Sequence, residues 1–170
     1  NMAIFSIARS KKIKNIITSR IEHPAVLQPI EYLMKNEKII SHFVDIDKNG
    51  NIDYQHLSSL LSKFESNTLV SLMHANNEIG IINDIKKIGE ICKKNNALFH
   101  SDAVQTVCHY EIDLSEIHIN SITASAHKFH GPKGVGFIYL SDDTMIDPYI
   151  FGGGQELSLI HISEPTRPMN

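Results

Sequence analysis

The lysine at position 128 lies in a setting that favours covalent chemistry. It follows the apolar run 122–126 and precedes the glycine-containing turn 131–134. This pattern predicts a lysine at the end of a strand, where it is a candidate for Schiff-base formation with a carbonyl compound. Ser125 and His127 precede it and add hydrogen-bond donors suited to a phosphate group.

Polar residues also follow other predicted strands at the point where each strand ends. In open α/β sheets, ligands bind beyond the carboxyl ends of the strands, so such clusters are expected to share one pocket. Four clusters fit this description: Glu22-His23 after 15–19, Asn76-Asn77-Glu78 after 69–75, Asp102 and Gln105 after 97–100, and His127-Lys128 after 121–126.

These clusters contain each group that a pyridoxal phosphate (PLP) site needs. PLP requires a lysine for covalent attachment, a carboxylate for the pyridine nitrogen, a flat group against the ring and donors for the phosphate. The candidates are Lys128 for attachment, Asp102 for the pyridine nitrogen, His23 for stacking, Ser125 and His127 for the phosphate, and Gln105 and Asn77 for the phenolic oxygen.

The elements that position these residues alternate between strand-like and helical patterns. This alternation predicts an α/β fold with a mainly parallel sheet flanked by helices. Strands are expected at 15–19, 39–46, 69–75, 97–103, 121–126 and 134–140, and helices at 54–64, with Asp53 as its cap, at about 85–95, with Asp84 as its cap, and from about Pro24.

Composition narrows the class of protein. The chain has 170 residues, 42% of them hydrophobic, which is enough for one domain or a part of one. Its net charge of −3, with basic residues spread along the chain, argues against nucleic acid. The sequence contains neither an apolar run of membrane-spanning length nor a signal-peptide pattern, so we expect no membrane partner and a cytoplasmic location. Cys92 and Cys108 give no disulfide framework and no zinc spacing.

Six motifs occur in an order that resembles the cysteine desulfurases of the class V aminotransferase group, which are fold-type I PLP enzymes. A single motif would be a weak signal, whereas the ordered set is specific. The motifs are Glu22-His23-x-Ala25-Val26, His74-x-Asn76-Asn77-Glu78-Ile79-Gly80, Asp102-Ala103-x-Gln105, Ser125-x-His127-Lys128, Gly131-Pro132-Lys133-Gly134-x-Gly136 and Gly152-Gly153-Gly154-Gln155-Glu156.

This resemblance implies that residues 1–156 form part of the large PLP-binding domain, with Lys128 carrying the cofactor. It further implies that the parent enzyme converts L-cysteine to L-alanine and transfers the sulfur to an enzyme cysteine as a persulfide. The sulfur would serve the assembly of iron–sulfur clusters or other sulfur-containing cofactors, through an acceptor such as an iron–sulfur scaffold protein. The family pattern also implies a homodimer for the intact parent.

The sequence departs from the family pattern at both ends. The Thr-Glu-Ser phosphate loop would lie before Asn1, and the persulfide cysteine and the substrate-carboxylate arginine would lie beyond Glu156. Neither Cys92 nor Cys108 matches the catalytic position. We therefore expect an internal fragment that does not turn over cysteine by itself. Residues 157–170, which contain a Ser-Glu-Pro-Thr-Arg-Pro run, are interpreted as vector- or adaptor-derived.

Two other classes of function stay open. Within the enzymes, a selenocysteine lyase or another class V lyase would share the cofactor residues. Outside them, the chain could be a non-catalytic structural module or an EF-hand-like calcium module, because Asp45–Asp53 matches six positions of the calcium loop. Against calcium, the twelfth position is His56, which cannot supply the bidentate carboxylate.

Overall fold

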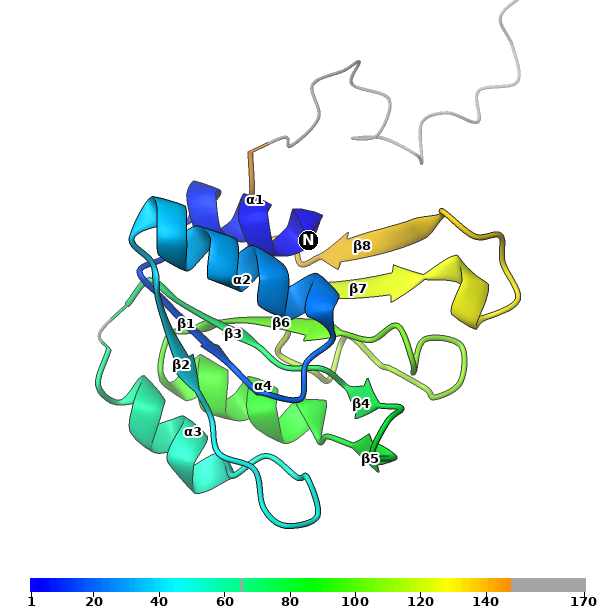
Figure 1. Cartoon of the computed structure of the whole chain (residues 1–170), viewed down its shortest axis with the longest axis horizontal. Helices are drawn as coiled ribbons and strands as arrows, with labels where there is room; N and C mark the ends of the chain where they lie inside the picture. The colour runs from blue at the N-terminus through cyan, green and yellow to red at the C-terminus, as the bar shows by residue number, and fades with distance from the viewer. Residues whose placement is uncertain (65, 148–170) are drawn as a thin grey trace, which may run out of the picture.

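A six-stranded sheet forms the centre of the computed structural model, which describes residues 1–64 and 66–147 (Figure 1). The strand order is β2-β1-β3-β6-β7-β8, and every neighbouring pair is parallel except β7 and β8. This confirms the predicted α/β fold with a mainly parallel sheet. The strands are β1 (Asn15–Thr18), β2 (Ile40–Phe43), β3 (Thr68–Ser71), β6 (Leu98–Asp102), β7 (Ser121–Ser125) and β8 (Gly136–Leu140), and a separate hairpin pairs β4 (Ala75–Asn76) with β5 (Ile81–Ile82).

Helices cover both faces of the sheet (Figure 1). On one face lie α1 (Met2–Ser10) and α2 (Pro24–Glu37), and on the other lie α3 (Tyr54–Leu61) and α4 (Ile85–Lys94). A single turn of 3₁₀ helix, η1 (Ala126–Lys128), continues directly from β7. None of the helices in the described part of the chain is long and apolar enough to cross a membrane.

Local capping explains where α3 and α4 begin. The Asp53 side chain accepts hydrogen bonds from the backbone N–H groups of Gln55 and His56, both at 2.9 Å, and so starts α3. Asp84 starts α4 in the same way by accepting from the Lys87 N–H at 2.9 Å. Both predicted caps are therefore confirmed. Their apolar stripes face the sheet, with Leu57, Leu60, Leu61, Ile85, Ile88 and Cys92 all buried.

The opposite helical layer contains α1, an α-helix that the sequence did not predict. It buries Ile4 and Ile7 completely against the sheet and α2. Helix α2 begins with Pro24, which occupies a first-turn position where no N–H is needed. Pro29 lies inside α2, and the helix ends at Lys38 in a left-handed conformation with φ of 56°.

The two faces of the sheet differ in polarity, and this difference positions the site. Side chains alternate along a strand, so Phe99 packs into the apolar core beneath α3 and α4, whereas His100 and Asp102 point to the α1–α2 face. On that face, Ile16 and Leu69 are buried early in their strands. Polar side chains follow towards the carboxyl ends, among them Thr18, Ser71, His100, Asp102 and Thr123.

The predicted strand 69–75 is interrupted near Met73, whose backbone groups are bonded to side chains. The Met73 N–H donates to Glu22 Oε1 at 3.0 Å, and the Met73 carbonyl accepts from Asn83 Nδ2 at 2.8 Å. These side-chain bonds hold Met73 itself, while the neighbouring N–H groups of Leu72 and His74 still donate to the β6 carbonyls of His100 and Asp102, at 3.2 and 2.9 Å. Strand β3 ends at Ser71, and a new short strand starts at Ala75. The predicted strand at 39–46 is likewise shorter, at Ile40–Phe43.

Candidate cofactor-binding site

The predicted site residues lie at the carboxyl ends of the parallel strands β1, β6 and β7 and in the turn of the β4–β5 hairpin that follows β3. Each comes from a different connection: the β1–α2 turn, the β4–β5 turn, the end of β6 and its following turn, and the end of β7 with η1. In this order they are His23, Asn77, Asp102 with Gln105, and Ser125 with His127 and Lys128. The expected convergence of strand ends on one side of the sheet is therefore present.

Asp102 is the buried carboxylate of this group. Only 9% of the residue is exposed, and its Oδ1 accepts a hydrogen bond from the Val104 N–H at 3.0 Å. Burial raises the pKa of Asp102 above its usual value, while that hydrogen bond, the nearby imidazole of His23 and the α-amino group of Asn1 act in the opposite direction. Within residues 1–64 and 66–147, Asp102 has no salt-bridge partner. A cation placed beside it would relieve the cost of its burial.

Gln105 and Asn77 meet although 28 positions separate them in the sequence. The Gln105 Nε2 amide donates to Asn77 Oδ1 at 3.0 Å. The preceding residue, Asn76, fixes the turn that carries Asn77: its Oδ1 accepts from the N–H groups of Glu78 and Ile79, at 2.8 and 3.2 Å. The structure thus joins the two residues predicted to serve the phenolic oxygen of PLP.

His23 has a structural role in addition to its predicted stacking role. It is the N-cap of α2, and its Nδ1 accepts a hydrogen bond from the Ala25 N–H at 3.0 Å. This bond fixes which ring nitrogen is the acceptor and holds the ring at the start of the helix. The imidazole is exposed, so capping leaves it accessible to a ligand. Stacking on the cofactor ring stays a prediction.

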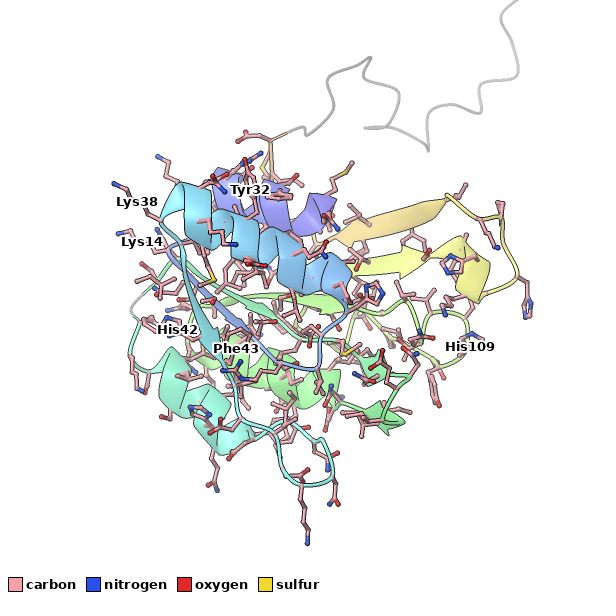
Figure 2. All side chains as sticks on the ribbon, in the orientation of Figure 1. Lys14, Tyr32, Lys38, His42, Phe43 and His109 are labelled. Carbon is pink, nitrogen blue, oxygen red and sulfur yellow. The ribbon has the colours of Figure 1, made fainter. Side chains whose placement is uncertain are left out.

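The fourth group of site residues lies at the end of β7 and in η1 and consists of Ser125, His127 and Lys128. The Ser125 hydroxyl and His127 Nδ1 are 2.8 Å apart and hydrogen-bonded. His109, which lies near η1 (Figure 2), donates from Nε2 to the Lys128 carbonyl at 2.9 Å and ties down the backbone that carries the lysine. The Lys128 side chain is exposed, although it directly follows the apolar run 122–126.

A second buried layer lies behind Asp102. His100 Nδ1 is 2.9 Å from the Ser71 hydroxyl, and its Nε2 is 3.4 Å from the Thr123 hydroxyl, so one imidazole links three neighbouring strands. Burial lowers the pKa of His100 to about 3, and the ring is therefore neutral at physiological pH. His100 and Asp102 are two residues apart on β6 and therefore share a face. Side chains alternate between the two faces of a strand, so this shared face could be read from the sequence.

The residues present fit PLP in the chemistry of their donors. A buried carboxylate without an ion-pair partner in the described chain suits a pyridine nitrogen that carries a proton. The hydroxyl–imidazole pair of Ser125 and His127 stands three residues and one residue before the exposed Lys128, which suits a phosphate near the attachment point. The amide pair of Gln105 and Asn77 supplies the remaining polar contact.

Sequence reasoning did not give roles to two residues that the site uses. Glu22 is buried and contacts Met73, and His109 anchors the backbone of Lys128. Both contacts join segments far apart in the chain, 51 and 19 positions, so no local pattern signals them. The one local signal for Glu22 was its position, since it is an acidic residue between the end of a strand and the proline that starts a helix.

The Asp45–Asp53 loop is organised as a turn rather than as a metal site. Asp47 accepts hydrogen bonds from the backbone N–H groups of Asn49 and Asn51, at 2.8 and 2.9 Å, and from Asn51 Nδ2 at 3.0 Å. Asp45 pairs with His56 at 2.9 Å. Across the described residues, no group of three His, Cys, Asp or Glu side chains is arranged to hold a metal ion. The carboxylates of the calcium-like motif are thus already bonded, Asp47 within the loop and Asp45 and Asp53 to the first turn of α3.

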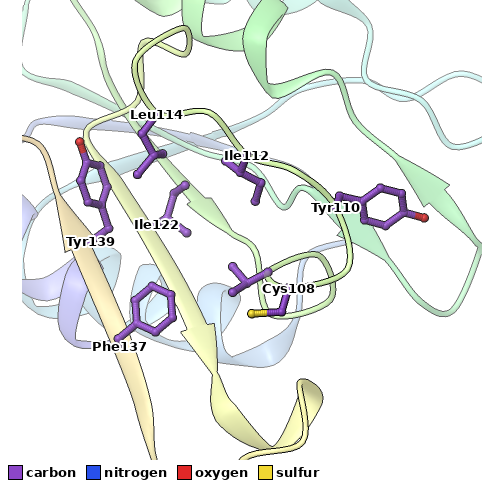
Figure 3. A pocket seen from close by; sticks show the side chains of 8 residues that line it. Cys108, Tyr110, Ile112, Leu114, Ile122, Phe137 and Tyr139 are labelled. Atoms are coloured by element: carbon purple, nitrogen blue, oxygen red, sulfur yellow. The ribbon is translucent and has the colours of Figure 1, made fainter.

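An apolar hollow of about 230 Å³ lies elsewhere (Figure 3). Ile122, Phe137 and Tyr139 line it from β7 and β8, on the face that is opposite to Asp102 and Thr123. The remaining lining comes from the connection after β6: Val107, Cys108, Tyr110, Ile112 and Leu114. Cys108 is exposed there, and Cys92 is a core residue whose pKa burial raises strongly. This hollow is separate from the strand-end cluster.

Comparison with known proteins shows which family the chain belongs to. The model of the aminotransferase class-V family matches residues 1–168. The chain belongs to this family, whose members named below are PLP enzymes.

Among curated proteins, the chain is 45% identical over 158 residues to "Cysteine desulfurase IscS" of Dictyoglomus turgidum, covering 92% of this chain and 39% of that protein. It is 40% identical over 158 residues to "Putative cysteine desulfurase IscS 1" of Bacillus subtilis, covering 92% of this chain and 41% of that protein. The chain therefore spans about two-fifths of the length of the curated relatives it matches.

Solved structures of related proteins share the fold of this chain. A "NIFS-LIKE PROTEIN" superposes with a TM-score of 0.82 at 39% identity, covering 91% of this chain and 43% of that chain. "SspA in complex with cysteine" superposes with a TM-score of 0.79 at 34% identity, covering 94% of this chain and 46% of that chain. The predicted fold-type I PLP class is confirmed. The motif Gly152–Glu156 and the segment 157–170 lie outside the described residues, and the domain boundary at 156 stays a prediction.

Proposed function

We propose that this chain is the PLP-binding segment of a cysteine desulfurase, with Lys128 as the residue that carries the cofactor. The observation that supports this most is the buried Asp102 without an ion-pair partner in the described chain, which lies at the same sheet edge as the exposed Lys128. The two relatives above bear the name cysteine desulfurase, which makes this activity the best-supported one for the family member.

Each residue then has a defined task. The Lys128 amine attaches the cofactor, and Asp102 keeps a proton on the pyridine nitrogen. Ser125 and His127 hold the phosphate, while Gln105 donates to the phenolic oxygen and is oriented by Asn77. His23, fixed by its capping bond, covers one face of the ring. When bound, PLP supplies an electron sink for bonds at the substrate α-carbon. His109 fixes the backbone of Lys128, so the amine starts from a set position.

We further propose L-cysteine as the substrate of the parent enzyme, a sulfur-acceptor protein such as an iron–sulfur scaffold as its partner, and a homodimer as its assembly. The supporting facts are the names of the curated relatives and a structural relative described as being in complex with cysteine. A class V lyase acting on selenocysteine would use the same cofactor residues. A stronger spectral response to L-selenocysteine than to L-cysteine would favour it.

The test is the visible absorbance of PLP bound to the purified chain. The unmutated chain, called the parent in all the experiments below, should bind PLP and develop an absorbance band. This band should disappear completely in Lys128→Ala, because only a lysine amine forms the Schiff base. Lys133→Ala, which removes an exposed lysine five residues away, should retain the band. An identical band in Lys128→Ala would contradict the assignment of the attachment point, and absence of binding in every variant would contradict the function of this segment.

The substrate class is tested on the same samples. L-cysteine should change the band of the PLP-loaded chain, and L-serine at equal concentration should change it less. Because free PLP also reacts with cysteine, the Lys128→Ala sample mixed with PLP provides the background. An equal response of the parent and this variant would argue against L-cysteine as the substrate.

A further inference from the structure

Glu22 is a buried acid that joins two segments of the candidate site. It lies in the β1–α2 turn directly before His23, and only 5% of it is exposed. Its Oε1 accepts from the Ser19 hydroxyl at 2.8 Å and from the Met73 N–H at 3.0 Å. One oxygen therefore connects the turn that carries His23 to the segment that leads from β3 to Asn77.

Two amide side chains strengthen the same connection. Asn76 Nδ2 donates to the Ile21 carbonyl at 2.7 Å, which is a second link between the two segments. Asn83 Nδ2 donates to the Met73 carbonyl at 2.8 Å, so both backbone groups of Met73 are held by side chains. The placement of the Asn77 segment against the His23 turn thus depends on side-chain bonds instead of a strand ladder.

The second oxygen of Glu22 shows which protonation state the site favours. Oε2 is buried and has no hydrogen-bond partner in the described residues. An ionised carboxylate there would leave charge without solvent or donor, which is costly, whereas the protonated form is neutral. Burial raises the pKa of Glu22 to about 8, and the negative charge of Asp102 acts in the same direction.

The other neighbours of Glu22 do not reverse this preference. The Met73 N–H and the Ser19 hydroxyl lower its pKa, but less than burial raises it. His74, on the β3–β4 connection, has a pKa lowered by its own burial, so its ring favours the neutral form. His23 follows on the same turn and is exposed. Glu22 and Asp102 are therefore two carboxyl groups near one site that cannot both carry charge at low cost.

We propose that Glu22 is a positioning residue whose protonated carboxyl group braces the His23 turn against the 73–77 segment and leaves the negative charge at this edge to Asp102. The brace would set the distance between the group that stacks on the cofactor and the amide pair that meets its phenolic oxygen. This role rests on the proposed function of the site, whereas the bonds of Glu22 do not.

The first experiment measures unfolding of the chain in urea from pH 5 to pH 8. Because the folded pKa of Glu22 exceeds the unfolded value, the folded chain binds the extra proton in this window, and stability falls as pH rises. Glu22→Gln keeps an acceptor and a donor without titrating. The unfolding constant of the parent should rise relative to that of Glu22→Gln by roughly two orders of magnitude across the window. The control Glu90→Gln, at an exposed position on α4, should keep a constant ratio to the parent.

The second experiment measures PLP affinity of the same variants by absorbance. At pH 7, Glu22→Gln should bind PLP as the parent does, and Glu22→Ala should bind about tenfold more weakly, since the brace contributes hydrogen bonds that only the amide restores. From pH 7 to pH 9, the ratio of parent to Glu22→Gln affinity should fall, because only the parent gains a second charge beside Asp102.

The two experiments separate the brace from the function. One outcome is that the parent does not bind PLP while the ratio of its unfolding constant to that of Glu22→Gln still changes with pH. The proposed function would then be wrong, and the proposal of a protonated Glu22 brace would be supported. If the unfolding ratio between the parent and Glu22→Gln stays constant from pH 5 to pH 8, the protonated brace is refuted. Equal PLP affinities of Glu22→Ala and Glu22→Gln at pH 7, with PLP bound by the parent, would refute the positioning role.

Discussion

Two acidic regions of this molecule resemble binding sites in the sequence, but their carboxyl groups differ in burial, in hydrogen bonding and in the direction of their pKa shifts. In the Asp45–Asp53 loop, the Asp47 carboxylate is exposed, accepts three hydrogen bonds within the loop and has a lowered pKa because of them. At the strand ends, Glu22 and Asp102 are buried and their pKa values are raised by burial.

This difference shows how a structural carboxylate can be told from one that awaits a partner. The loop uses its oxygens on its own N–H groups, so a ligand would have to displace bonds that already exist. The strand-end cluster keeps a buried, unpartnered oxygen at Glu22 and an Asp102 without an ion pair in the described chain. Buried carboxyl groups without a compensating partner therefore indicate that the strand ends are the functional region, although the loop matches a better-known motif.

The sharpest test of the contrast is Asp102→Asn, which should have opposite effects on stability and on binding. Removing a buried charge should stabilise the ligand-free chain, and the gain should grow as pH rises above the unfolded pKa of Asp102, because its folded pKa is raised. PLP affinity should fall by about 1.5–3 kcal/mol through loss of a charge-assisted hydrogen bond. Urea unfolding and absorbance titration measure the two effects.

The matched control is Asp142→Asn, at an exposed position after β8, which should change neither quantity. If Asp102→Asn lowered stability and left PLP affinity unchanged, Asp102 would belong with the structural carboxylates of the loop.

A smaller effect is expected from Asp53→Ala in the loop region. Asp53 caps α3 through two backbone N–H groups, so its loss should cost about 1 kcal/mol of unfolding free energy. PLP binding should stay as in the parent, since α3 packs on the face of the sheet away from Asp102. Urea unfolding gives the first value and absorbance titration the second. A loss of PLP affinity would erase the functional distinction between the two regions.

The smallest effect concerns calcium. Millimolar calcium should leave the melting temperature of the chain unchanged, because a ligand that binds the folded state would raise it and the loop offers no free set of carboxylates. Magnesium at the same concentration controls for ionic strength. A specific increase with calcium, lost in Asp47→Asn, would revive the EF-hand interpretation of the loop.

Much of this arrangement could be predicted from the sequence because it follows from local patterns. Apolar periodicity and the caps Asp53 and Asp84 located α3 and α4, and the strand-end rule located Asp102 and Gln105. Helix α1 was not predicted. Its start at Met2 left few residues before it from which to read a beginning.

Other features depend on contacts between distant segments. Glu22 and Asn83 hold the backbone of Met73 just after β3 ends at Ser71, whereas the apolar run 69–75 alone predicted a longer strand. The position of His23 directly before Pro24 fits a helix cap as well as stacking on a ring, and the structure shows the capping bond. The exposure of Lys128 also could not be predicted, because it depends on which segments pack beside η1.

The most direct test of the central claim is to locate the cofactor on the chain. The PLP-loaded chain is reduced with borohydride, which fixes a Schiff base as a stable amine, and peptides are mapped by mass spectrometry. We predict a phosphopyridoxyl group on Lys128, with a yield of about one per chain that Lys128→Ala abolishes. A group found mainly on Lys133, or spread evenly over the surface lysines and unchanged in Lys128→Ala, would contradict the account.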